Sequence, residues 1–126
     1  MPLRGVTVLV VEDNAESRET TQRMLEQLGA QVVTAENGEQ GLAAILSHVP
    51  DLVLVDLIMP VMDGYEFARR LRNDPKYRRV RLVALTGLRE EPSVLKTWSL
   101  GFDGHLTKPV SMEGLDLLLS RFTGRH

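Results

Sequence analysis

The chain has 126 residues, of which 43% are hydrophobic and 25% are charged, as is ordinary for one globular domain with a single core. The net charge of −2 gives no bulk reason to bind nucleic acid or membranes, and the lack of cysteine excludes disulfides and thiolate chemistry. No apolar run is long enough to cross a membrane. We therefore expect residues 1–126 to form a single cytoplasmic domain, with no direct nucleic-acid binding and no membrane insertion.

Strand and helix patterns alternate five times along the chain. The predicted strands are short aliphatic runs that cover Val6–Val11, Gln31–Ala35, Asp51–Asp56, Arg81–Thr86 and His105–Thr107. The predicted helices cover Ala15–Leu28 after an Asn14 N-cap, Glu39–Ser47, Tyr65–Asn73, Pro92–Ser99 and a last segment capped by Ser111. In the second and last helices, the residues expected to face the core of the domain are Leu42, Ile45, Leu46, Leu115, Leu118, Leu119 and Phe122.

This alternation predicts an α/β fold, a doubly wound five-stranded parallel sheet of flavodoxin-like topology with five helices on its two faces. Five strands in this length fit the order 2-1-3-4-5, in which ligands bind at the carboxyl ends of strands 1 and 3. Glu12 and Asp13 follow the first strand and Asp56 ends the third, so these three carboxylates should converge. Close like charges need a cation, and an all-oxygen donor set favours Mg²⁺, or Mn²⁺, as the cofactor.

The fourth and fifth strands bring further polar groups to the same edge. Thr86 and Gly87 end the fourth strand, and Lys108 follows the fifth. A carboxylate nucleophile, a divalent cation, a hydroxyl and an ammonium together suit a transferred phosphoryl group. The alternative interpretation is that each is an ordinary surface residue at a strand end, but polar residues ending four different strands in matching roles make this interpretation weak.

Four motifs resemble those of response-regulator receiver domains of two-component signalling, over essentially the whole chain. The motifs are Val-Val-Glu12-Asp13-Asn, Asp56-Leu-Ile-Met-Pro60-Val-Met-Asp63-Gly64, Ala-Leu-Thr86-Gly and Lys108-Pro109. The resemblance implies a signalling domain rather than an enzyme, although one that assists its own phosphorylation and dephosphorylation. The segment Gly101–Val110 resembles receivers fused to hybrid sensor kinases more than those of transcription factors, and a stand-alone receiver is the other option.

The resemblance also implies residue roles. Asp56 would accept the phosphoryl group from a sensor histidine kinase or a histidine phosphotransfer protein. Asp13 would bind Mg²⁺ directly, with help from Glu12 and the backbone carbonyl of Ile58. The oxygens of the phosphoryl group would be held by Thr86 and Lys108, with Gly87 beside them at the cofactor.

The resemblance further implies an output face formed by the fourth helix, the fifth strand and the fifth helix. His105 stands where the family often has Tyr or Phe, which leaves an aromatic switch in doubt. Val94 and Trp98 share one helix face, so we expect them to be exposed near His105 and Leu95 to point to the core. A phosphorylation-dependent partner or a dimer could use this surface.

Two other functions share parts of this pattern. A phosphatase of the haloacid-dehalogenase class uses a strand-end Asp and Mg²⁺, but it needs a second Asp where this chain has Ile58. A flavodoxin-like FMN binder would need a phosphate-binding loop after the first strand, where Glu12, Asp13 and Asn14 stand.

Three details complete the predictions. The Lys108-Pro109 bond is expected to be cis, because the chain must turn at once into the last helix. The resemblance to receivers also implies that Ile58 and Leu88 would border the path of a water that attacks the phosphoryl group, and their apolar side chains are expected to slow dephosphorylation. A solvated surface is the favoured interpretation of one basic cluster, with an acidic partner as the alternative; its members are Arg69, Arg70, Arg72, Lys76, Arg78, Arg79 and Arg81.

Overall fold

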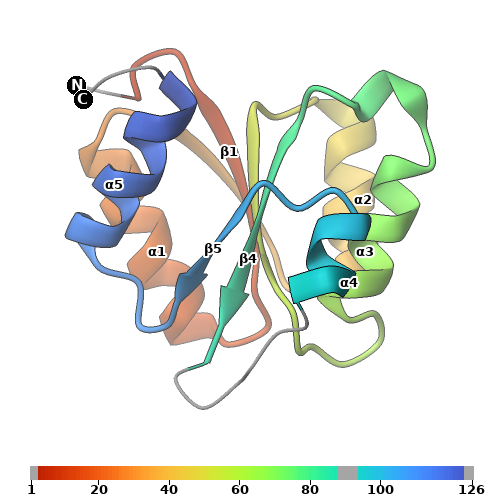
Figure 1. Ribbon diagram of the computed structural model, residues 1–126. Helices are drawn as coiled ribbons and strands as arrows, with labels where there is room; N and C mark the ends of the chain where they lie inside the picture. The colour runs from red at the N-terminus through yellow and green to blue at the C-terminus, as the bar shows by residue number, and fades with distance from the viewer. Residues whose placement is uncertain (1–2, 88–93, 124–126) are drawn as a thin grey trace.

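The computed structural model describes residues 3–87 and 94–123, in which a parallel sheet lies between two layers of helices (Figure 1). The strands are β1 (Thr7–Val11), β2 (Gln31–Ala35), β3 (Leu52–Asp56), β4 (Arg81–Thr86) and β5 (Gly104–Thr107). The helices are α1 (Ala15–Gln27), α2 (Gly38–Ser47), α3 (Gly64–Arg72), the short 3-10 helix η1 (Pro75–Tyr77), α4 (Val94–Ser99) and α5 (Met112–Thr123). The predicted elements are present, η1 was not predicted, and the predicted helix start at Pro92 lies outside the described residues.

The strands pair in the order β2-β1-β3-β4-β5, which confirms the predicted topology. Helices α1 and α5 cover one face of the sheet, and α2, α3 and α4 cover the other (Figure 1). The register pairs Val11 of β1 with Val55 of β3. The carboxyl ends of these two strands therefore lie side by side, and the residues that follow them share one edge of the sheet.

The two helical layers explain why the central strands are apolar without alternation. Val53 and Val55 face the layer that contains Phe67 of α3, whereas Leu52 and Leu54 face the layer of α1 and α5. All of these side chains are buried, as the continuous aliphatic sequence predicted. The inward residues predicted for α5 are confirmed, because Leu115, Leu118 and Leu119 are buried and Phe122 is partly buried.

Helix α2 confirms part of the face predicted for it, because Ile45 is buried and Leu42 is partly buried against the same core cluster. Leu46, expected to face the core with Ile45, is 73% exposed, so that prediction is wrong. Gly41 lies so close to β1 that a Cβ there would be 2.9 Å from Cγ2 of Val11. The buried stripe therefore runs through Gly41 and Ile45, and Leu46 lies about 100° round the helix from Ile45.

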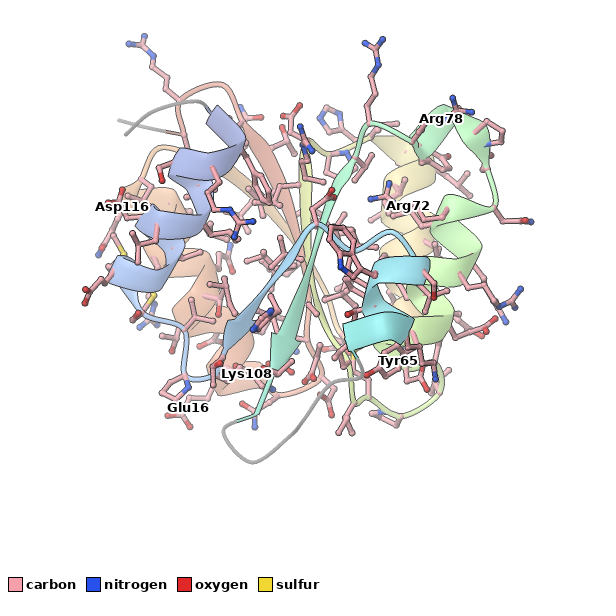
Figure 2. The ribbon with its side chains drawn as sticks, in the orientation of Figure 1. Glu16, Tyr65, Arg72, Arg78, Lys108 and Asp116 are labelled. Atoms are coloured by element: carbon pink, nitrogen blue, oxygen red, sulfur yellow. The ribbon has the colours of Figure 1, made fainter. Side chains whose placement is uncertain are left out.

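One member of the basic cluster is not part of a solvated surface. Arg72 points inward from α3, whereas Arg78 lies at the outside of the molecule (Figure 2). The guanidinium of Arg72 donates to the carbonyls of Tyr77 and Gly101 at 3.0 and 2.9 Å and lies 3.3 Å from Oδ2 of Asp103. For Arg72 the solvated interpretation is therefore wrong, because this side chain joins three chain segments.

The surface around α4 and β5 agrees in part with the prediction. Trp98 is 72% exposed, and His105 is exposed on β5. Both line a groove of about 310 Å³, together with Phe102 of the preceding loop and Arg121 of α5. The side chains of Val94 and Leu95 lie outside the described residues. None of the described helices has the length and apolar character needed to span a membrane.

Candidate functional site

The three carboxylates predicted to converge do so. Glu12 directly follows β1 and Asp56 ends β3, and the side chains are 1% and 4% exposed. Asp13 is exposed at the mouth of the site. One carboxylate oxygen from each residue lies within 4.8 Å of the others. The arrangement follows from the strand order, which places the ends of β1 and β3 next to each other.

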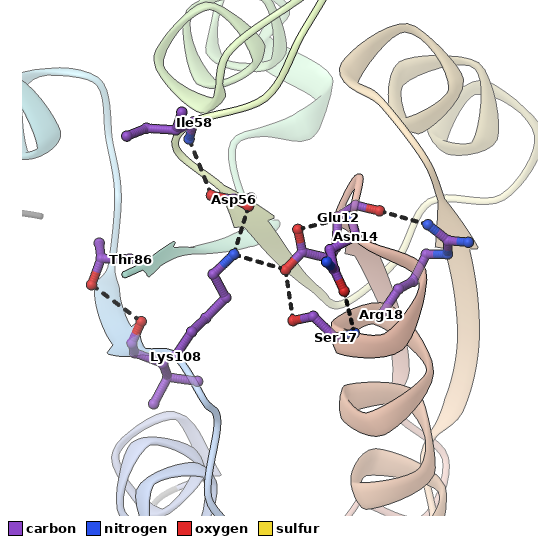
Figure 3. Close-up of polar contacts among 9 residues, drawn as sticks. Glu12, Asn14, Ser17, Arg18, Asp56, Ile58, Thr86 and Lys108 are labelled. Carbon is purple, nitrogen blue, oxygen red and sulfur yellow. Dashed lines mark hydrogen bonds and ion pairs between the residues drawn. The ribbon is translucent and has the colours of Figure 1, made fainter. Parts of the chain in front are cut away.

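Lys108 reaches across the edge of the sheet into this acidic group. Its Nζ donates hydrogen bonds to Oδ2 of Asp56 at 2.8 Å and to Oε1 of Glu12 at 3.0 Å (Figure 3). The backbone of Lys108 is also held in place, because its amide donates to the carbonyl of Thr86. The bond between Lys108 and Pro109 is cis, as predicted.

The environment keeps Lys108 charged. Burial alone would lower the pKa of its ammonium, but the hydrogen bonds to Asp56 and Glu12 outweigh this effect, and the pKa is raised above its ordinary value. The ammonium is therefore a fixed positive charge between two buried carboxylates. Such charge-assisted hydrogen bonds are shorter and stronger than those between neutral groups.

The sequence did not reveal how Glu12 itself is held. Its carboxylate accepts hydrogen bonds from Oγ of Ser17 at 2.8 Å and from the amide of Asn14 at 3.4 Å (Figure 3). The guanidinium of Arg18 donates to the backbone carbonyl of Glu12 at 2.9 Å and lies 3.7 Å from the carboxylate of Glu36. The first turn of α1 therefore fixes both the side chain and the backbone of Glu12.

The loop after β3 shapes the surroundings of Asp56. Oδ1 of Asp56 accepts a hydrogen bond from the amide of Ile58 at 3.1 Å, and the Ile58 side chain is 62% exposed. A Cβ on Gly64 would lie 2.5 Å from the carbonyl oxygen of Asp56, so only glycine fits this close approach. Asp63 caps α3 by accepting from the amide of Glu66.

Thr86 lies at the predicted edge, but its hydroxyl points elsewhere. The side chain is 2% exposed, and Oγ1 donates to the carbonyl of Leu106 on β5 at 3.5 Å (Figure 3). Gly87 follows, half-buried, and Leu88 lies outside the described residues. The hydroxyl of Thr86 is thus directed at the fifth strand and not at the carboxylates.

The charge and chemistry of the site suit a divalent cation. Three carboxylates face one ammonium, so the group keeps an excess of negative charge. All candidate ligands are oxygens, which hard cations such as Mg²⁺ prefer. Within residues 3–87 and 94–123, Glu12, Asp13 and Asp56 are the one group of three or more potential ligands that lie close enough together to hold an ion. The donor set therefore fits the metal that the sequence predicts.

Comparison with known proteins identifies the class. Residues 8–120 match the family model of the response regulator receiver domain, so the chain belongs to this family of two-component signalling domains. It is 37% identical over 107 residues to the phosphate regulon transcriptional regulatory protein PhoB of Pseudomonas aeruginosa. That match covers 85% of this chain but only 47% of PhoB, so the chain spans about half the length of this relative.

Solved structures give the same result. The chemotaxis protein CheY4 of Vibrio cholerae is 31% identical with a TM-score of 0.84, over 92% of this chain and 97% of CheY4. The receiver domain of sensor histidine kinase PA1611 from Pseudomonas aeruginosa is 30% identical with a TM-score of 0.84, over 94% and 98% of the two chains. Its structure contains a magnesium ion coordinated in the active site cleft. The phosphatase and FMN-binding alternatives are not favoured.

Proposed function

We propose that Asp56 accepts a phosphoryl group from a phosphohistidine of a sensor histidine kinase or a histidine phosphotransfer protein, the two kinds of protein with which receiver domains interact. The observation that carries this proposal is the 2.8 Å contact between Nζ of Lys108 and Oδ2 of Asp56. A buried carboxylate held beside a fixed ammonium is suited to attack phosphorus, because the same ammonium can neutralise the oxygens that arrive with it.

The phosphoryl group is transferred by displacement at phosphorus. An oxygen of Asp56 forms a new bond to phosphorus while the bond from phosphorus to the histidine nitrogen breaks. The electron pair of that bond stays on the imidazole nitrogen, and the ring takes up a proton from solvent. The Lys108 ammonium then moves from the carboxylate to one phosphoryl oxygen. The Thr86 side chain rotates, so that its hydroxyl leaves the carbonyl of Leu106 and donates to a second phosphoryl oxygen. Gly87 follows Thr86 and leaves room for the bound group.

The cation is expected to be Mg²⁺ or Mn²⁺, with Glu12, Asp13, Asp56 and the backbone carbonyl of Ile58 as the residues that would hold it. When bound, it would neutralise carboxylate charge and polarise the phosphoryl oxygens. Asp13 is the exposed member of the group, so it can exchange water for metal most easily. Oε1 of Glu12 already accepts hydrogen bonds from Ser17 and Lys108, so we expect this carboxylate to assist the metal indirectly, through water.

The remaining parts of the proposal concern context. Residues 1–126 would form a single receiver domain in the cytoplasm, supported by a family match that covers residues 8–120. The domain would assist its own phosphorylation and dephosphorylation. The output surface would include Val94, Trp98 and His105, where a partner or a second copy binds after phosphorylation.

The proposal is tested by incubating the protein with acetyl phosphate and Mg²⁺ and measuring its intact mass. Wild type should gain one phosphoryl group, and Asp56→Asn should gain none. Asp74→Asn, which changes an aspartate near α3 and η1, is the control and should label like wild type. Stoichiometric labelling of Asp56→Asn would overturn the proposal.

A further inference from the structure

Ser17 stands in an unusual position on the first turn of α1. Its amide donates to Oδ1 of Asn14, which caps the helix, and its hydroxyl donates to Oε1 of Glu12 at 2.8 Å. That carboxylate oxygen is the same one that accepts from Nζ of Lys108 at 3.0 Å. A continuous path of hydrogen bonds therefore runs from Ser17 through Glu12 and Lys108 to Asp56 (Figure 3).

The burial of Glu12 makes the serine hydroxyl important. Because only 1% of the Glu12 side chain is exposed, its carboxylate must take most of its hydrogen bonds from groups inside the protein. The described partners of the Glu12 carboxylate are the Ser17 hydroxyl, the Lys108 ammonium and, at a longer 3.4 Å, the amide of Asn14. Without the hydroxyl, Oε1 would depend on the ammonium alone.

Because Glu12 and Asp56 share the Lys108 ammonium, a change at one carboxylate alters the position of the ammonium beside the other. Nζ of Lys108 lies 2.8 Å from Asp56 and 3.0 Å from Glu12. If Glu12 lost its hydroxyl partner, it would draw the ammonium closer or turn away from it. Either movement shifts Lys108 from the place where it can receive a phosphoryl oxygen at Asp56, and such displacements lower reaction rates.

We propose that Ser17 is a positioning residue for phosphoryl transfer, which orients the Glu12 carboxylate and thereby fixes the Lys108 ammonium beside Asp56. This inference rests on the proposed function of Asp56. It adds a residue on α1, outside the set at the carboxyl edge of the sheet, to those that decide how fast the domain is phosphorylated.

The matched pair Ser17→Val and Ser17→Thr tests the inference, because Val and Thr share a β-branched shape and differ in the hydroxyl. With acetyl phosphate and saturating Mg²⁺, Ser17→Val should label about threefold to tenfold more slowly than wild type. This is less than the full value of one hydrogen bond to a charged group, because Ser17 acts on Asp56 only through Glu12 and Lys108. Ser17→Thr should stay within about twofold. Ser17→Ala also lacks the hydroxyl and replaces Ser17→Val if that variant does not fold.

A second measurement separates positioning from a structural role. In a Glu12→Gln background, the further change Ser17→Val should have little effect on the labelling rate, because the path to Lys108 is already altered. Equal rates for wild type and Ser17→Val, or the same slowing in both backgrounds, would overturn the inference. If wild type itself is not labelled at Asp56, the proposed function fails instead, so the two failures are distinguishable.

Discussion

Lys108 and Asp56 are in direct contact, with Nζ of the lysine 2.8 Å from Oδ2 of the aspartate, although 52 positions separate them in the chain. The contact joins the loop after β5 to the end of β3, across the intervening strand β4. Because the same ammonium also contacts Glu12, a single cation links the ends of the strands that carry the buried carboxylates. This relationship is the basis of the first two predictions.

Replacing Lys108 with Met should lower the free energy of unfolding by about 1.5–3 kcal/mol at neutral pH, the range for hydrogen bonds to charged groups. The pKa of Lys108 is higher in the folded state than its ordinary value of 10.5. Its contribution is therefore fully present below pH 10.5 and is lost as the pH rises through the folded-state pKa.

Urea unfolding of wild type and Lys108→Met over neutral to alkaline pH measures this dependence. The difference between the two proteins should stay constant up to pH 10.5 and shrink above it. Lys76→Met changes a lysine whose side chain is 63% exposed, and it serves as the control. A difference for Lys108→Met that persists unchanged at the alkaline end would contradict the proposed pairing.

Binding of Mg²⁺ should stabilise the folded domain, because the unfolded chain has no assembled group of carboxylates. At free Mg²⁺ a hundredfold above the dissociation constant, the gain should be about 2.7 kcal/mol. Asp13→Asn should need at least about tenfold more Mg²⁺ for the same rise in melting temperature, a loss of about 1.4 kcal/mol in binding. Glu19→Gln, an exposed acid on α1, should titrate like wild type. Identical titrations of wild type and Asp13→Asn would remove Asp13 from the metal site.

Arg72 should matter for stability and not for phosphorylation. Arg72→Ala removes the guanidinium that donates to the carbonyls of Tyr77 and Gly101, although the Tyr77 carbonyl keeps its bond from the amide of Val80, and the loss should cost about 2–4 kcal/mol. Arg78→Ala, at an exposed member of the same cluster, should change stability by about 0.5 kcal/mol or less. The contacts of Arg72 lie before β4 and β5, at the opposite edge of the sheet from Asp56, so both variants should accept phosphate normally while folded. Equal stability of the two variants would refute the structural role.

The phosphorylated state should be long-lived, since the amide of Ile58 donates to Asp56 and its exposed aliphatic side chain cannot hydrogen-bond an attacking water. The double variant Ile58→Asn/Leu88→Glu should lose phosphate roughly tenfold to a hundredfold faster than wild type, which corresponds to about 1–3 kcal/mol. Release of phosphate is followed after removal of the donor with Mg²⁺ present. Val61→Asn, an exposed position of the same loop, should retain the wild-type lifetime. Equally fast loss of phosphate from wild type and from the double variant would show that Ile58 and Leu88 do not block the attacking water.

The sequence allowed the strand order and the meeting of Glu12 with Asp56 to be predicted, because both depend on patterns local to each strand. It did not indicate the roles of Ser17 or Arg72. A serine five positions after Glu12 and an arginine in a basic stretch have no distinctive pattern, and their partners are defined only by the packed fold. Leu46 was misplaced for a related reason, since the close contact of Gly41 with β1 decides which face of α2 is buried.

The most direct test of the account is to locate the phosphoryl group. Wild type is phosphorylated by acetyl phosphate with Mg²⁺ and treated with borohydride, which reduces an aspartyl phosphate to homoserine, and its peptides are then sequenced by mass spectrometry. The account predicts homoserine at position 56 and at no other aspartate, with slower formation in Lys108→Met. Homoserine at position 13 or 63 with Asp56 intact, or no acyl phosphate at all, would contradict it.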